Sequence, residues 1–115
     1  MTDADANHPI DLAELDTATE GDHELREELI GEYLLDCESR LATLRTALSE
    51  DNPVSIRNEA HAIKGGSGAV AAGGMVAIAQ ELEGMAESGD VAGCEGLVAR
   101  LGEEFARVKE FCEAR

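Results

Sequence analysis

The sequence of 115 residues is poor in aromatic and basic residues, and these shortages limit what can fill its core and what it can bind. It has no tryptophan, one tyrosine and two phenylalanines, so aliphatic side chains must fill most of the core. Nine basic residues stand against 25 acidic ones, and the formal net charge of -16 argues against nucleic acid and anionic membranes as partners. Because 43% of the residues are hydrophobic, the chain is nevertheless too apolar for a disordered acidic tail.

Cysteine pairs and long hydrophobic runs are also missing. Cys37, Cys94 and Cys112 form no Cys-x-x-Cys motif, which favours free thiols packed as small apolar side chains over a disulfide or a zinc site. The longest nearly apolar run, residues 69–79, is too short and too rich in glycine to span a bilayer. The acidic N-terminus lacks the apolar segment of a signal peptide. We therefore expect one soluble, cytoplasmic, monomeric domain.

Apolar residues recur at intervals of three and four, which is the spacing of one face of a helix. No segment alternates usefully with a period of two, so no strands are predicted. The predicted helices lie within residues 10–20, 22–50, 75–87 and 91–112, with one more that begins at Pro53. Residues 1–9 are predicted to be a flexible tail. Residues 10–115 then form an all-α domain, an antiparallel up-down four-helix bundle with a short extra N-terminal helix.

Capping residues support these boundaries. Asp22, Asn52 and Asp90 are suited to cap the helices that follow them, and Pro53 suits the first position of its helix. Gly89 provides a stop for the helix before it. The residues predicted to face the core are Leu25, Leu29, Tyr33, Cys37, Leu41, Leu44, Leu48, Val54, Ile56, Ala60, Ile63, Met75, Ile78, Leu82, Met85, Val91, Cys94, either Leu97 or Val98, Leu101, Phe105, Val108 and Cys112.

Residues 60–70, AHAIKGGSGAV, allow three interpretations. As a linker, the glycines would end the helix at Lys64 on propensity alone, since each costs about 1 kcal/mol in a helix. Against this, Ile63 and Val70 are seven residues apart, as on one apolar helix face. As a nucleotide-binding loop, residues 66–71 match Gly-x-Gly-x-x-Ala, but a helix precedes them where that motif needs a strand. A P-loop also fails, because Lys64 precedes the glycines.

The third interpretation is a reactive histidine on a continuous helix. One helix face then carries His61, Lys64, Gly65 and Gly68. Arg57 lies one turn earlier, and the core face lies elsewhere, so His61 should face solvent. Residues 60–80 contain no aspartate or glutamate, although the chain as a whole is acidic. This indicates that the acid-free patch has a function. Nothing nearby has metal-ligand spacing or forms a nucleophile elbow, and His8 and His23 lack such organised neighbours.

The same residues resemble the histidine-containing phosphotransfer (HPt) domain, whose pattern is roughly A-H-x-L-K-G-x-S followed by a helix that ends in L-E or L-Q. The matching residues are Ala60, His61, Ile63, Lys64, Gly65, Ser67, Leu82 and Glu83. The resemblance covers about residues 10–112. The chain departs from the family pattern at Ala71, where glycine is usual, and at Gly73 and Gly74, where larger residues are usual.

The resemblance implies a phosphorelay carrier in which His61 takes a phosphoryl group from a receiver-domain aspartate, or from a kinase, and passes it to a response-regulator aspartate. Lys64 and Arg57 are suited to neutralise phosphate oxygens, and Glu83 is implied as the acceptor that fixes the His61 ring. The residues implied to dock the partner are Arg57, Gly65, Ser67, Gly68 and Gln80. Receiver domains and a hybrid sensor histidine kinase are the implied partners. No cofactor is expected, since magnesium would come with the receiver.

Two other functions compete with this one. The first is an acidic helical adaptor that docks a signalling partner without carrying phosphate, although an adaptor does not need the histidine. The second is the phosphoacceptor region of a sensor kinase, which normally has an acid and soon a proline after its histidine. Here Ala62 and Gly65 follow His61, no ATP-binding motif is present, and too few residues remain for an ATPase domain. The chain is therefore predicted to be a stoichiometric carrier and not an enzyme.

Overall fold

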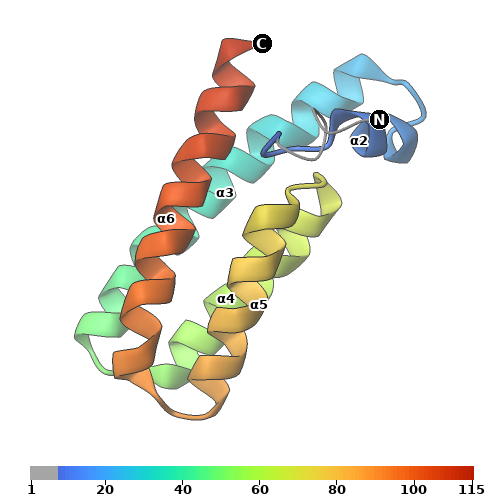
Figure 1. Cartoon of the computed structure of the whole chain (residues 1–115). Coiled ribbons are helices and arrows are strands. Elements are labelled where there is room, and N and C mark those ends of the chain that lie inside the picture. Colours follow the sequence, from blue (N-terminus) through green and yellow to red (C-terminus); the bar gives the residue numbers. More distant parts are fainter. Residues whose placement is uncertain (1–7) are drawn as a thin grey trace.

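The computed structural model describes residues 8–115, and this part of the chain is all-α. Its helices are α2 (Leu12–Ala18), α3 (His23–Ser49), α4 (Pro53–Ala69), α5 (Gly73–Glu87) and α6 (Val91–Ala114). Helices α3 to α6 run up and down in turn, each packs on the next, and α6 closes the bundle against α3 (Figure 1). The predicted four-helix bundle with a short extra N-terminal helix is confirmed. Most of the predicted tail, residues 1–7, lies outside the described residues.

The predicted caps are confirmed, and each satisfies a backbone donor at the start of its helix. Asp22 accepts a hydrogen bond from the amide of Leu25 at 3.0 Å, and Asn52 accepts one from Ser55 at 3.2 Å. Asp90 accepts one from Gly93 at 2.9 Å. Among residues 8–115, none of the helices has both the length and the apolar character that a membrane span requires.

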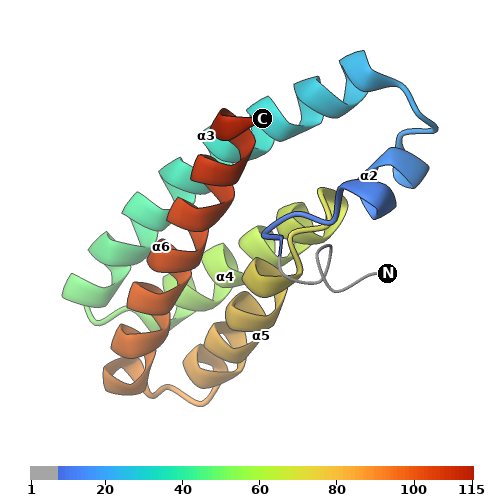
Figure 2. The same cartoon turned by 45° about the horizontal axis from the view of Figure 1, so that its top comes forward.

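The core follows the predicted stripes with two exceptions. Leu25 is 41% exposed, because the first turns of α3 extend past the ends of α4 and α5 and have little to pack against (Figure 2). Val54 is 67% exposed, because it lies two residues before the buried Ile56 and therefore about 200° around the helix from it. Cys37 and Cys94 are buried free thiols, as predicted, whereas Cys112 is half-buried.

Helix α4 runs through its glycines and ends at Ala69, so the break that propensity places at Lys64 is wrong. Tertiary packing overrides the cost of glycine here. Ile63 and Val70 are both buried, and the Tyr33 hydroxyl on α3 is 2.7 Å from the Ser67 hydroxyl, with both side chains buried. Gly66 lies against the Tyr33 ring, since a Cβ at this position would be 3.7 Å from Cδ1. These contacts hold the glycine segment in the bundle.

The connection between α4 and α5 differs from expectation. Gly73 and Gly74 begin α5, which was predicted to begin at residue 75. Gly74 leaves room for the carboxylate of Glu104 on α6, because a Cβ there would lie 2.6 Å from Oε2. A carboxylate is favourable beside the first turn of a helix. Ala71 has a left-handed φ of 60°, a conformation that glycine adopts without strain.

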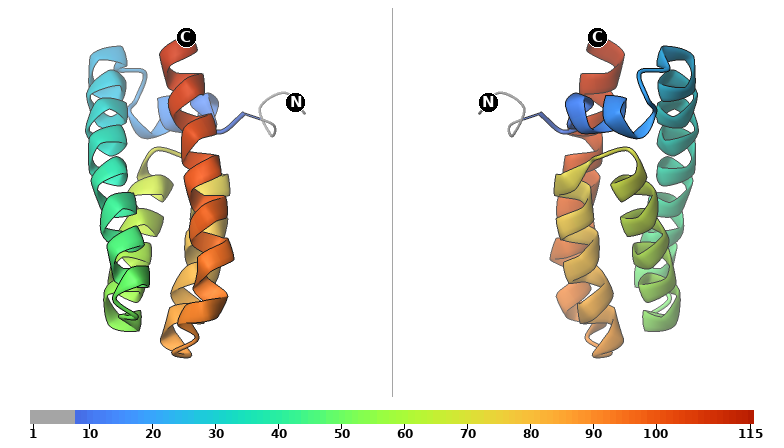
Figure 3. Two further views of the ribbon diagram at one scale, coloured as in Figure 1. Left: turned by 90° about the vertical axis from the view of Figure 1, so that its left-hand side faces the viewer. Right: turned by 90° about the vertical axis from the view of Figure 1, so that its right-hand side faces the viewer.

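Helix α2 crosses the bundle beside this connection (Figure 3). The amide of Asp11 donates a hydrogen bond to the carbonyl of Ala71 at 3.0 Å. Arg26 on α3 forms an ion pair with Asp16 on α2 at 2.7 Å. Ile10 and Leu15 are fully buried, so apolar packing holds α2 against the bundle together with these polar contacts.

Candidate functional site

His61 lies on the outer face of α4, and a carboxylate on the neighbouring helix holds one side of its ring. Nδ1 of His61 is 2.9 Å from Oε2 of Glu83 on α5, and the His61 side chain is 58% exposed. A neutral imidazole that carries its proton on Nδ1 donates it to this carboxylate, which leaves the lone pair on Nε2. The geometry therefore favours a nucleophilic nitrogen that faces solvent.

Glu83 is nearly buried, with 7% of its surface exposed, and it contacts three basic side chains. Its Oε1 is 2.7 Å from Nζ of Lys64, while its Oε2 lies 3.7 Å from the Arg57 guanidinium in addition to its contact with His61. Hydrogen bonds from Lys64 and then from His61 lower the pKa of the Glu83 carboxyl below its usual value. Glu83 thus stays ionised at neutral pH, as an acceptor for the His61 ring requires.

The predicted acid-free patch is not free of acid in space. Residues 60–80 lack carboxylates, but α5 places Glu83 and Glu87 beside the same basic residues. Arg57 lies 3.4 Å from Glu87, so both Arg57 and Lys64 already have carboxylate partners. Helix pairing brings together charges that are far apart in sequence, which the spacing within one segment did not reveal.

The glycines on the His61 face leave open surface. A Cβ at Gly65 would have no neighbouring atom within 4 Å, so packing among the described residues does not require glycine there. Gly68 faces Val76 on α5, with its hypothetical Cβ 4.0 Å from Cγ2. Gln80 is exposed and lines a cavity together with Gly68. Gly65, Gly68 and Gln80 thus lie at the surface on the His61 side of α4 and α5.

Ser67 is not part of this surface, and its predicted docking role is wrong. It has no exposed surface and points inward to the Tyr33 hydroxyl. Its position was available from the sequence, since Ser67 follows the buried Ile63 by four residues and so lies on the core face. Elsewhere, the ring of His8 lies 5.1 Å from that of Phe111, a contact that sequence reasoning missed. Across residues 8–115, no three potential ligand side chains group in a way that could hold a metal ion.

Comparison with known proteins places the chain in a family. The sequence model of the Hpt domain matches residues 28–111, which is most of the chain, and the chain belongs to the Hpt domain family. Such domains have a phosphotransfer role in two-component signalling, as carriers rather than enzymes, and interact with receiver domains and kinases.

A solved structure supports the same assignment. The chain is similar to histidine-containing phosphotransfer protein B (HptB) from Pseudomonas aeruginosa PAO1, with a TM-score of 0.84 and 28% sequence identity. The similarity covers 92% of this chain and 93% of that chain. No curated protein matches the sequence.

Proposed function

We propose that the chain is a phosphorelay intermediate in which His61 accepts a phosphoryl group from a receiver-domain aspartate, or from a kinase, and passes it to a response-regulator aspartate. The observation that supports this best is the 2.9 Å contact between His61 Nδ1 and Glu83, on a ring that is 58% exposed. An imidazole held at one nitrogen and open at the other is a competent nucleophile.

The proposed transfer exchanges one bond to phosphorus for another. The Nε2 lone pair of His61 attacks the phosphorus of the aspartyl phosphate, and the N–P bond forms. The bond between phosphorus and the aspartyl oxygen breaks, so the receiver's carboxylate leaves with the electron pair. The proton on Nδ1 stays on the ring, and Glu83 stabilises the cationic phosphoimidazole. The reverse transfer uses the same atoms, and the partners present set its direction.

Lys64 and Arg57 are the basic residues nearest to this chemistry. Both already contact Glu83, at 2.7 Å and 3.7 Å, so a phosphoryl group on His61 would attract cations that the carboxylate already positions. The open surface at Gly65 would let a receiver approach the ring closely. We assign magnesium and the reacting aspartate to the receiver domain, and ATP chemistry to a hybrid sensor kinase.

Radiolabel from a phosphorylated receiver domain tests the proposal. The wild type should acquire acid-labile, base-stable label, and His61→Gln should acquire none while its circular dichroism stays unchanged. His23→Gln is the matched control, since His23 is an exposed histidine at the start of α3 and should keep full labelling.

Two results would decide against a carrier. Label that persists in His61→Gln would place the phosphoryl group elsewhere. Stable binding of a phosphorylated receiver to the wild type without any label would favour the alternative function, a non-phosphorylated acidic adaptor that docks a signalling partner.

A further inference from the structure

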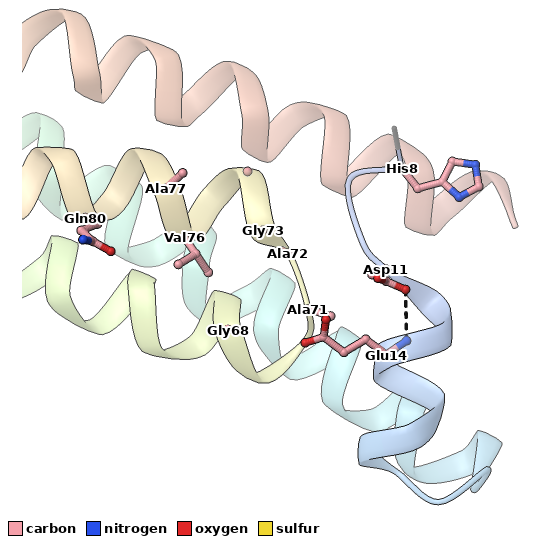
Figure 4. A pocket seen from close by; sticks show the side chains of 11 residues that line it. His8, Asp11, Glu14, Gly68, Ala71, Ala72, Gly73, Val76, Ala77 and Gln80 are labelled. Carbon is pink, nitrogen blue, oxygen red and sulfur yellow. Dashed lines mark hydrogen bonds between the residues drawn. The ribbon is translucent and has the colours of Figure 1, made fainter. Parts of the chain in front are cut away.

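A cavity of about 560 Å³ lies where α2 meets the α4–α5 hairpin (Figure 4). Gly68, which lines it, follows His61 by seven residues and so lies about two turns farther along α4. The other small or apolar residues that line it are Ala71, Ala72, Gly73, Gly74, Val76 and Ala77. The cavity therefore lies about two helical turns along α4 from His61. Its small and apolar lining suits an apolar side chain.

The ionisable side chains that line this cavity are two carboxylates and one histidine. They are Asp11, which is the N-cap residue of α2, Glu14 in the first turn of α2, and His8. None of the described residues that line the cavity is lysine or arginine. Asp11 accepts a hydrogen bond from the amide of Glu14 at 3.1 Å, which fixes the first turn of α2. Glu14 is exposed, has no ion-pair partner among the described residues, and extends toward Ala71 in Figure 4. Its charge is thus available to a partner, whereas Glu83 is already paired.

We infer that this cavity is a specificity pocket for the relay partner, which seats an apolar side chain of a receiver domain while Glu14 and Asp11 select receivers with a lysine or arginine beside that side chain. The inference rests on the proposed function. Charges at the rim of an interface mainly set the association rate and its salt dependence, and they reject partners of like charge. The ties of α2 to Ala71 and Arg26 keep the two carboxylates in place.

Other occupants fit the charges less well. A second copy of the chain would bring another net charge of -16 to an acidic cavity. Residues 1–7 of the chain itself include Asp3 and Asp5, which carry the same sign as the cavity. A basic, partly apolar surface on a receiver is the complementary choice.

The test measures phosphotransfer to His61 from purified receiver domains, each phosphorylated on its aspartate, at low and high salt. Glu14→Gln and Glu14→Lys form a graded series, and glutamine keeps a polar side chain of similar size in the first turn of α2. Glu95→Lys is the matched control, because Glu95 is exposed near the start of α6 and the substitution changes the net charge equally. The start of α6 lies at the end of the bundle opposite α2 (Figure 1). Labelling by phosphoramidate, a small donor, reports on the His61 site alone.

With the fastest receiver, Glu14→Lys should slow transfer roughly tenfold at low salt, Glu14→Gln should slow it less, and both losses should shrink as salt is added. Glu95→Lys should have little effect, and phosphoramidate labelling should be equal in all four proteins. A receiver whose docking lysine or arginine is replaced by glutamate should regain transfer to Glu14→Lys.

Equal receiver rates for Glu14→Lys and wild type would overturn the inference, as would an equal loss in Glu95→Lys. Dimerisation of the wild type that Glu14→Lys abolishes would assign the cavity to a second copy instead. These results leave the proposed function intact as long as the wild type is labelled. A wild type that neither donor labels would overturn the proposed function, and this inference with it.

Discussion

At the scale of single residues, Glu83 joins the side chains on which the proposed chemistry depends. Its two oxygens are 2.7 Å from the Lys64 amine and 2.9 Å from His61 Nδ1. A nearly buried carboxylate is costly unless it is paired, and here the basic partners come from the adjacent helix. The same contacts that make Glu83 tolerable inside the bundle also hold the His61 ring, so stability and the proposed function both involve this one side chain.

This coupling predicts how stability depends on pH. The pKa of Glu83 is lowered from about 4.5, so its charged form stabilises the fold above the unfolded-state pKa, and that contribution is lost as pH falls through the folded-state value. We expect Glu83→Gln to be less stable than wild type at pH 7, with a difference in unfolding free energy that narrows below about pH 4.5. Urea unfolding at a series of pH values measures this, and a difference that stays constant down to pH 3 would contradict it.

At the scale of the elements, the helices and caps could be predicted from the sequence, but the glycine segment could not. Helix propensity is local, and it placed a break at Lys64. The contacts that continue α4 to Ala69 come from Tyr33, which is 34 residues away from Ser67 in sequence. Near the start of α5, Gly74 likewise lies against Glu104 of another helix, which the local sequence does not reveal.

The candidate site also combines residues whose positions follow from local spacing with residues whose contacts depend on helix packing. His61 and Lys64 share a helix, so their spacing alone placed them on one face. Glu83 entered by family resemblance, and the structure brings it within hydrogen-bond distance of both. The contacts of Arg57 with Glu83 and Glu87 depend on how α4 packs against α5, and no spacing within one segment specifies that packing.

The α4–α5 connection gives a prediction at this scale. Ala71 has a φ of 60°, which costs roughly 1–2 kcal/mol for a residue with a Cβ. Ala71→Gly removes that strain but makes the unfolded chain more flexible, so the unfolding free energy should rise by a net amount of up to about 1 kcal/mol. Ala77→Gly is the matched control. Ala77 is exposed within α5, where glycine should cost about 1 kcal/mol instead. Destabilisation by both substitutions would contradict the prediction.

At the scale of the whole molecule, the His61 site and the cavity lie on the same pair of helices, α4 and α5. The net charge of -16 repels acidic partners at long range. Around His61 the basic residues are balanced by Glu83 and Glu87, while the acidic cavity lies farther along the same pair of helices. Such a distribution of charge favours one orientation of a partner over the reverse, which a relay needs if the aspartate and the histidine are to meet.

Gly65 tests whether this face receives a protein. A side chain at Gly65 would extend into open space one turn after His61, because a Cβ there has no neighbour within 4 Å. Gly65→Ala should therefore raise the unfolding free energy by up to about 1 kcal/mol, since alanine loses less backbone entropy than glycine in a helix. Gly65→Gln should slow transfer from a phosphorylated receiver far more than labelling by phosphoramidate, because only the protein donor needs the space.

The rates of receiver transfer and of phosphoramidate labelling, measured for both variants, test this prediction, and Gly65→Ala controls for loss of the glycine itself. Equal impairment with the two donors would show that glutamine damages the His61 site directly, and full activity of Gly65→Gln with the receiver would show that no partner approaches over Gly65.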